Sequence, residues 1–172
     1  AITPRTKCIM PVHMCGSMAW MSDLKMICKT NDLILLEDAC QSIGATYKGQ
    51  HLGTIGHAGT FSFDYVKTIT CGEGGAVTTN NGELAERIRL MKNFGFSGYD
   101  NVVYIGTNGK MPEVSAAMGL TSLESMDDFI AVNRRNYHAY VEGVEDVPGL
   151  RVLPYSDDEQ TNYQYIVLVL DE

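Results

Sequence analysis

The stretch 33–36, Leu-Ile-Leu-Leu, constrains the fold of this chain more than any other feature. These four apolar residues stand between Asp32 and the pair Glu37-Asp38, so the run is short and has no polar face. Strands that are apolar throughout are typical of parallel sheets whose two faces are both covered. The run therefore predicts an inner parallel strand that ends at two carboxylates.

The segments around this run alternate between strand and helix patterns. We expect strands at 8–14, 60–64, 76–79 and 161–170, and helices at 19–30, 81–93 and 112–145, the last with Gly119 as a weak point. Stretches rich in glycine at 44–59 and 94–109 predict irregular structure. Strands that alternate with helices predict an α/β fold, in which helices flank a mainly parallel sheet.

Composition excludes several function classes. The 172 residues carry a formal net charge of -8, which argues against non-specific binding to nucleic acid or to anionic membranes. The longest apolar run is only strand-sized, so no membrane span is expected. The five cysteines form no C-x-x-C pair and the four histidines have no metal-ligand spacing, so we expect no metal site and a reducing cytoplasm.

The two ends of the chain suggest a piece of a longer protein. The sequence opens at Ala1 without methionine and stops at Asp171-Glu172, directly after the apolar run 165–170. A final strand of this kind often lacks its partners. A processed protein is the alternative interpretation.

Three features could carry chemistry. Asp38 follows an apolar strand, where α/β proteins place ligand-binding groups, although a helix cap or turn is an equal alternative. Lys67 follows the strand-like 61–63 and could be desolvated, as Schiff-base lysines are, although a lone lysine is ordinarily a surface residue. Ser62 and the Gly-rich turn 72–75 suit a phosphate, but they match neither a Walker A loop nor a dinucleotide motif.

The order of the motifs is more specific than any one of them. The blocks EDACQSIGA (37–45), YKG (47–49), GTFSF (59–63), Lys67 and GEGG (72–75) follow one another along the chain. This order resembles the DegT/DnrJ/StrS family of nucleotide-sugar aminotransferases, which are pyridoxal 5'-phosphate (PLP) enzymes of fold type I. Further blocks resemble the same family: PVHMCG (11–16), RIRLMKNFG (87–95) and MPEVSAAMG (111–119).

The resemblance implies a role for each of five residues. Lys67 would form the Schiff base with PLP and move the proton between substrate and cofactor. Asp38 would pair with the protonated pyridine nitrogen and keep the ring an electron sink. Gln41 would touch the phenolic oxygen of the ring and Ser62 would bind the phosphate. Asn108 would reach the phosphate of the neighbouring subunit in a homodimer.

The resemblance also implies a reaction and a domain division. An amino group, from glutamate, would pass to a keto-deoxy-sugar nucleotide for polysaccharide or glycoside biosynthesis. Residues 1–125 would be part of the large PLP-binding domain, and 126–172 the linking helix and the start of an incomplete small domain. Family relatives that dehydrate sugars have histidine in place of the lysine, so Lys67 argues against that branch.

Two other interpretations stay open. The chain could be a non-catalytic fragment that folds and oligomerises without binding cofactor. It could also be a generic α/β binding module, an interpretation that an exposed Lys67 far from Asp38 would favour. Gly109-Lys110 depart from the aromatic residue and arginine usual after the family's asparagine, so substrate contacts from this loop do not carry over.

Overall fold

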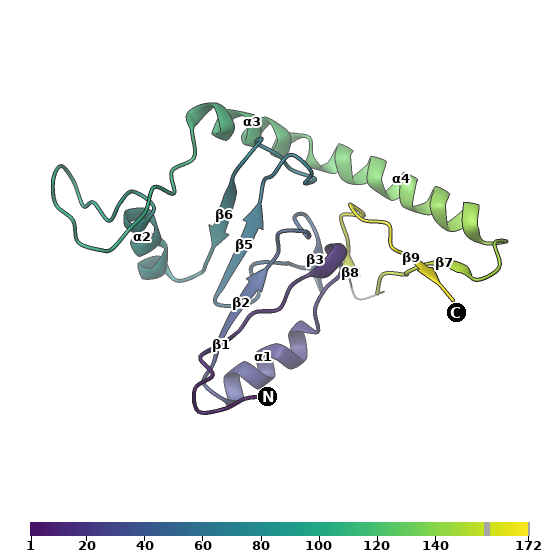
Figure 1. The fold of residues 1–172 in the computed structure, drawn as a ribbon, viewed down its shortest axis with the longest axis horizontal. Coiled ribbons are helices and arrows are strands. Elements are labelled where there is room, and N and C mark those ends of the chain that lie inside the picture. The colour runs from purple at the N-terminus through teal and green to yellow at the C-terminus, as the bar shows by residue number, and fades with distance from the viewer. Residues whose placement is uncertain (157–158, 172) are drawn as a thin grey trace.

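A four-stranded sheet forms the centre of the molecule. The structure, a computed structural model, describes residues 1–156 and 159–171. The strands lie in the order β1-β2-β5-β6 (Figure 1): β1 (Cys8–Ile9), β2 (Ile34–Asp38), β5 (Ala58–Ser62) and β6 (Gly75–Thr78). The first three are parallel, and β6 is antiparallel to β5. The expected α/β class with a mainly parallel sheet is confirmed.

Helices and two small sheets surround this centre. Figure 1 shows α1 (Met21–Thr30) beside β1 and β2, and α2 (Gly82–Met91) beyond β6. The helices α3 (Glu113–Glu124) and α4 (Met126–Val144) follow one another along one side. The small sheets are β4-β3-β8, made of Gln50–His51, Thr46–Tyr47 and Glu159–Gln160, and β7-β9, made of Leu150–Val152 and Leu168–Leu170.

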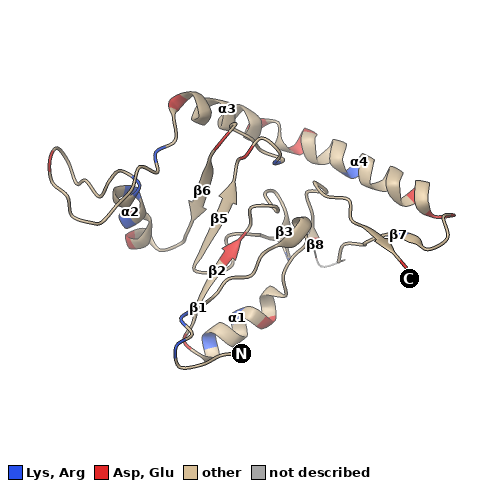
Figure 2. Ribbon diagram, in the orientation of Figure 1, with Lys and Arg blue, Asp and Glu red and all other residues tan. Residues whose placement is uncertain are grey.

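Burial along β2 alternates rather than running unbroken. Leu35 is 1% exposed and Glu37 is fully buried, whereas Ile34 is 53% exposed. The strand is inner and parallel as expected, but α1 covers only one of its faces within the described residues. The buried core on that face holds these residues: Met21, Cys28, Leu33, Leu35, Ala45, Tyr47, Leu52 and Ile55. Figure 2 shows the acidic end of β2 in the middle of the molecule.

The expected helix at 112–145 is two helices, and the break lies at Ser125 rather than at Gly119. Gly119 is buried inside α3, and a Cβ atom there would lie 3.3 Å from the Cβ of Cys71. This glycine therefore lets α3 approach the turn after β5. The break falls at the expected boundary between 125 and 126, but the division into two domains stays a proposal.

Several element boundaries differ from the expectations. The strand expected at 161–170 is limited to β9, and 8–14 contributes only β1 and a bridge between Val12 and Asp38. The stretch 44–59, expected to be irregular, contains β3 and β4. Each difference follows from long-range pairing, which overrides the local pattern.

Three tyrosine rings form a second packing centre beneath α4. The ring centroids of Tyr137, Tyr155 and Tyr163 lie 5.3–5.5 Å apart, and Tyr137 is 8% exposed. The hydroxyl of Tyr155 donates to the carbonyl oxygen of Tyr165 at 2.8 Å. Burial, the largest cause, raises the pKa of Tyr155 to about 12. This cluster fixes the C-terminal residues against α4.

Candidate active site

Two predicted site residues end neighbouring parallel strands. Asp38 is the last residue of β2 and pairs in register with Thr60, and Ser62 ends β5 two residues farther on. The carboxyl ends of parallel strands share one edge of a sheet, where α/β proteins bind ligands. One carboxylate oxygen of Asp38 accepts the backbone N–H of Cys40 at 3.1 Å, which turns the chain away from the strand. The carboxylate also interacts with the Cys40 thiol.

Lys67 lies in the turn beyond β5 and is half-buried. Its backbone N–H donates to the carbonyl oxygen of Asp64 at 3.0 Å. Burial raises the pKa of the Cys40 thiol, the Asp38 carboxylate raises it further, and the charge of Lys67 acts in the opposite direction. A carboxylate and an ammonium group therefore act on the same thiol. Asp38 and Lys67 thus both lie within electrostatic reach of Cys40.

Gln41 and Ser62 keep the donors that a phosphorylated cofactor would need. The side-chain oxygen of Gln41 accepts the backbone N–H of Cys15 at 2.6 Å, so its NH2 group remains the donating end. Ser62 Oγ accepts the backbone N–H of Asp64 at 3.4 Å and can still donate its own hydrogen. Asp64 Oδ1 is buried without a hydrogen-bond partner among the described residues. A buried acceptor of this kind fits a site that another molecule completes.

Asn108 does not join this group within the chain. It is exposed and forms a bridge with Asn93, next to the end of α2. Thr107 and Gly109 on either side donate to the carbonyl oxygens of Met91 and Lys92. The chain itself therefore places Asn108 beside α2 and away from the end of β2.

Sequence reasoning missed a buried cluster around Glu37. One carboxylate oxygen accepts the backbone N–H groups of Ile55 at 2.7 Å and Gly56 at 2.6 Å. The other accepts Gly53 N–H at 2.8 Å and His13 Nε2 at 3.0 Å. Burial pushes the pKa of Glu37 up, but the hydrogen bonds from His13, Gly56 and Gly53 outweigh it and hold the pKa below its ordinary value. We call these residues the Glu37 cluster.

The cluster also fixes the position of Asp38. The Nδ1 atom of His13 lies 3.1 Å from the backbone N–H of Ala19, which can only donate, so Nε2 carries the proton that is given to Glu37. The backbone N–H of His13 donates to the backbone carbonyl oxygen of Asp38 at 3.0 Å. The backbone N–H of Asp38 donates to the carbonyl oxygen of Pro11 at 2.9 Å. The sequence indicated only that His13 has no metal-ligand spacing to the other histidines. No local pattern marks its pairing, because Glu37 is 24 residues away.

The segment 159–164 was also missed. Both carboxylate oxygens of Glu159 bind the turn before α1, at Ser17 Oγ (3.1 Å) and at the N–H of Met18 (2.7 Å). Asn162 is fully buried and donates to the carbonyl oxygens of Gln41 at 3.1 Å and Ile43 at 3.0 Å. These contacts join residues more than a hundred positions apart, so no short-range signal could have found them.

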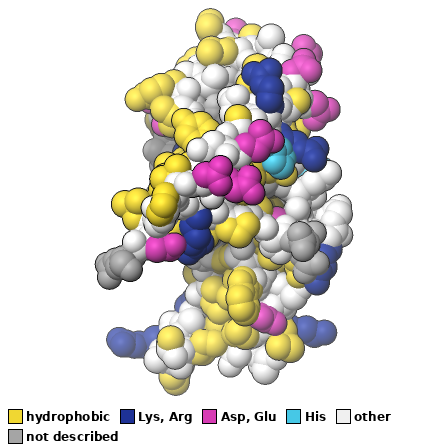
Figure 3. Space-filling model, turned by 90° about the vertical axis from the view of Figure 1, so that its right-hand side faces the viewer, with side chains coloured by type: hydrophobic (Ala, Val, Ile, Leu, Met, Phe, Trp, Pro, Cys, Tyr) yellow, Lys and Arg dark blue, Asp and Glu magenta, His cyan; other side chains and the backbone are white. Residues whose placement is uncertain are grey.

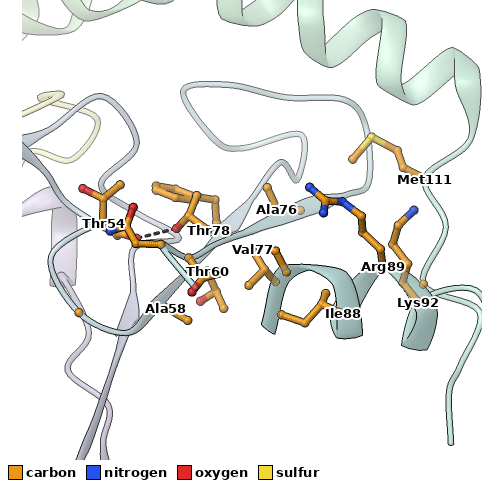
Figure 4. A pocket seen from close by; sticks show the side chains of 18 residues that line it. Thr54, Ala58, Thr60, Ala76, Val77, Thr78, Ile88, Arg89, Lys92 and Met111 are labelled. Carbon is orange, nitrogen blue, oxygen red and sulfur yellow. Dashed lines mark hydrogen bonds between the residues drawn. The ribbon is translucent and has the colours of Figure 1, made fainter. Parts of the chain in front are cut away.

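A cavity of about 830 Å³ lies beside β6 and α2 (Figure 4). Arg89 and Lys92 line it from α2, and Thr60 and Thr78 line it from the strands. Among the described residues, its lining includes none of the five predicted site residues. We place the candidate site at the ends of β2 and β5 because Asp38, Ser62 and the turn that carries Lys67 follow these two neighbouring strands.

Two further features limit what this chain can be. No helix in the described part of the chain is long and apolar enough to cross a membrane. Figure 3 shows apolar side chains on the surface at the end that carries α4 and the last strands, where Leu168 is 46% and Leu170 77% exposed.

Known proteins are similar to this chain in sequence and in fold. GDP-perosamine synthase of Caulobacter vibrioides is 40% identical over 136 residues, which cover 78% of this chain and 37% of that protein. The structure of DesI in the presence of its TDP-sugar product has a TM-score of 0.92 and 39% identity, over 99% of this chain and 44% of that one. The chain thus spans less than half the length of these relatives.

A third likeness bears on the cofactor. The structure of GDP-4-keto-6-deoxy-D-mannose-3-dehydratase of Escherichia coli, with bound hydrated PLP, has a TM-score of 0.90 and 27% identity. The match covers 100% of this chain and 49% of the dehydratase chain. Across residues 1–172 the sequence matches the family described as DegT/DnrJ/EryC1/StrS aminotransferases. This chain belongs to the DegT/DnrJ/EryC1/StrS aminotransferase family, whose members depend on PLP.

Proposed function

We propose that this chain is part of a PLP-dependent enzyme that moves an amino group from glutamate to a keto-deoxy-sugar nucleotide, for polysaccharide or glycoside biosynthesis. The observation that carries the proposal is the position of Asp38, Ser62 and the Lys67 turn at the carboxyl ends of the neighbouring parallel strands β2 and β5. The names of similar proteins, a perosamine synthase and a protein with a TDP-sugar product, support this substrate class. We propose this activity for the complete protein, because the relatives are more than twice as long as this chain.

Three residues would hold the cofactor by its polar groups. When bound, PLP supplies an electron sink that makes the amino-bearing carbon acidic. Asp38 would accept a hydrogen bond from the protonated ring nitrogen, which stays protonated. Gln41 donates its NH2 hydrogen to the phenolic oxygen, and Ser62 donates its hydroxyl hydrogen to the phosphate.

Lys67 would be the attachment point and the base. Its Nζ binds the cofactor between turnovers, and after release it takes and returns the proton of the amino-bearing carbon. The Asp38 carboxylate would stabilise the cationic cofactor ring. A lysine at this position also favours amino transfer over the sugar dehydration named for the Escherichia coli relative.

Asn108 would act outside its own subunit. It is exposed beside α2, so in our proposal it contacts the phosphate held by the second copy of a homodimer. Apolar side chains exposed on α3, such as Val114 at 82% and Leu120 at 64%, support a covered face there. We place the enzyme in the cytoplasm, where keto-sugar nucleotides and glutamate are available.

The test of the cofactor role uses the complete protein and PLP. We expect a yellow absorbance band on mixing, and after borohydride reduction a label that mass spectrometry maps to Lys67. Lys67→Met should remove the label. Lys25→Met, which changes an exposed lysine of α1, should leave it in place.

The test of the reaction follows on the same preparation. Glutamate should bleach the yellow band, and a panel of keto-deoxy-sugar nucleotides should restore it, with an amino sugar as product. Absence of both band and label from the complete protein would contradict the proposal and favour a non-catalytic relative. A label without amino transfer would keep the cofactor site and reject the substrate class.

A further inference from the structure

The side chain of Gln164 forms hydrogen bonds to the turn that carries Lys67. The side-chain oxygen of Gln164 accepts the hydroxyl of Thr68 at 2.9 Å and its backbone N–H at 3.3 Å. The Nε2 group of Gln164 donates to the carbonyl oxygen of Val66 at 2.9 Å. One planar amide thus grips the residue before Lys67 and the residue after it.

The chemistry of this contact requires an amide. Val66 presents a carbonyl oxygen, which needs a donor, and Thr68 presents donors, which need an acceptor. Glutamine offers both on one rigid group, whereas a carboxylate cannot donate and an apolar chain can do neither. The backbone N–H of Lys67 is already used by Asp64 at 3.0 Å. The Gln164 amide therefore restricts the backbone on both sides of Lys67, at Val66 and at Thr68.

The same segment holds the opposite side of the site. Asn162, two residues earlier, is fully buried and donates to the carbonyl oxygens of Gln41 and Ile43. Its own side-chain oxygen accepts the backbone N–H of Gln164 at 3.1 Å. The packing is close, because a Cβ atom on Gly16 would lie 2.8 Å from Asn162 Oδ1. Residues 162–164 thus connect the Gln41 turn to the Lys67 turn.

We propose that Gln164 is a positioning residue for Lys67: its amide sets where the Lys67 amine lies relative to Gln41 and Asp38. The inference rests on the proposed function, because it concerns the same lysine. It goes beyond it by assigning part of the site to the C-terminal segment, 97 residues after Lys67. A shift of about 1 Å in a reacting group can cost about 100-fold in rate.

The test compares Gln164→Met with Gln160→Met in the complete protein. The first keeps the side-chain length and removes the amide, and the second makes the same change on exposed β8. In the cofactor-free protein, the Thr68 amide should exchange its hydrogen faster in Gln164→Met only. With PLP and substrates, kcat should fall about 10- to 100-fold while KM for the amino donor changes by less than about threefold.

A second variant tests the same contact in case Gln164→Met does not fold. Thr68→Val removes the hydroxyl donor and leaves the backbone N–H, so its loss of kcat should be smaller. The double variant with Gln164→Met should lose less than the product of the two single losses, because both changes remove the same contact.

The outcomes separate the inference from the proposed function. Faster exchange at Thr68 with unchanged kcat would overturn the inference, since the amide would then be structural only. Unchanged exchange in Gln164→Met would overturn it as well, because the amide would not hold the turn. If the unaltered protein formed no Lys67 label with PLP, the proposed function would fail and the positioning role with it, whatever the exchange showed.

Discussion

Residues 33–62 and residues 82–124 differ sharply in how many of their side chains are buried. The first stretch buries apolar residues and a carboxylate together, including Leu35 at 1% and Glu37 at 0% exposure. In the second, the buried residues are two glycines, Gly95 and Gly119, while Leu120 is 64% exposed. Both stretches contain regular elements and apolar residues. Secondary structure alone therefore does not decide which part of this chain is its core.

The difference teaches that the candidate site rests on the buried region. Asp38 ends a strand that buries Leu35 and Glu37, Ser62 ends a strand that buries Ala58, and the Glu37 cluster fixes the backbone next to Asp38. In our proposal, Asn108, which lies in the exposed region, acts on another subunit. A site on buried strands and a contact from an exposed segment are expected to respond differently to mutation.

The largest expected effect comes from breaking the Glu37 cluster. In Glu37→Gln the NH2 group must face two donors whichever way it turns, since each carboxylate oxygen accepts two hydrogen bonds. A buried donor that loses its acceptor costs about 1–3 kcal/mol, and more where the lost acceptor was charged. We expect a loss of this size in urea unfolding of the 172-residue chain. A loss near that of an exposed substitution would show that the cluster is not needed for folding.

The pH dependence of stability sharpens the same test. Hydrogen bonds hold the folded pKa of Glu37 below its ordinary value of 4.5, although burial opposes them. The stabilisation is therefore fully present above that ordinary value and is lost as the pH falls through the folded pKa. The stability difference between the unaltered chain and Glu37→Gln should stay constant at higher pH and shrink below 4.5. A difference that widens toward acid would contradict the assigned charge.

One substitution made in each region tests the comparison directly. Leu35→Ala should cost about 2–5 kcal/mol, because it leaves a cavity in the core. Leu120→Ala should change the free energy of unfolding of the same chain by less than about 0.5 kcal/mol, because that side chain is 64% exposed. Equal losses would mean that the face of α3 is covered, as the proposed homodimer requires, and a dependence on protein concentration would then identify the dimer.

The smallest expected effect lies at the start of α2, which has no buried residue. The side chain of Asn81 caps this helix by accepting the backbone N–H of Leu84 at 3.0 Å. Asn81→Ala should cost about 1 kcal/mol, and the neighbouring Asn80→Ala much less. Thermal unfolding of the two variants gives the comparison. A larger effect of Asn81→Ala would show that α2 supports more of the fold than its exposure indicates.

Local patterns predicted the elements that depend on neighbours in sequence. The apolar run 33–36 gave an inner parallel strand, and the periodicity at 81–93 gave α2 nearly to its ends. The pattern failed at 161–170, where residues expected to form a strand use their side chains to bind distant turns. It failed again at Gly119, where a close approach to Cys71 looked like a helix weak point.

The sequence by itself determined the α/β class and the order of the motifs, because these depend on short-range pattern. The resemblance of that order to a known family is what points to PLP. Only the tertiary structure decided that Glu37 is buried against His13 and that Gln164 grips the Lys67 turn. Those contacts join residues 24 to 98 positions apart. The free energy of such a contact depends on what the folded chain brings alongside, and no local window of sequence contains both partners.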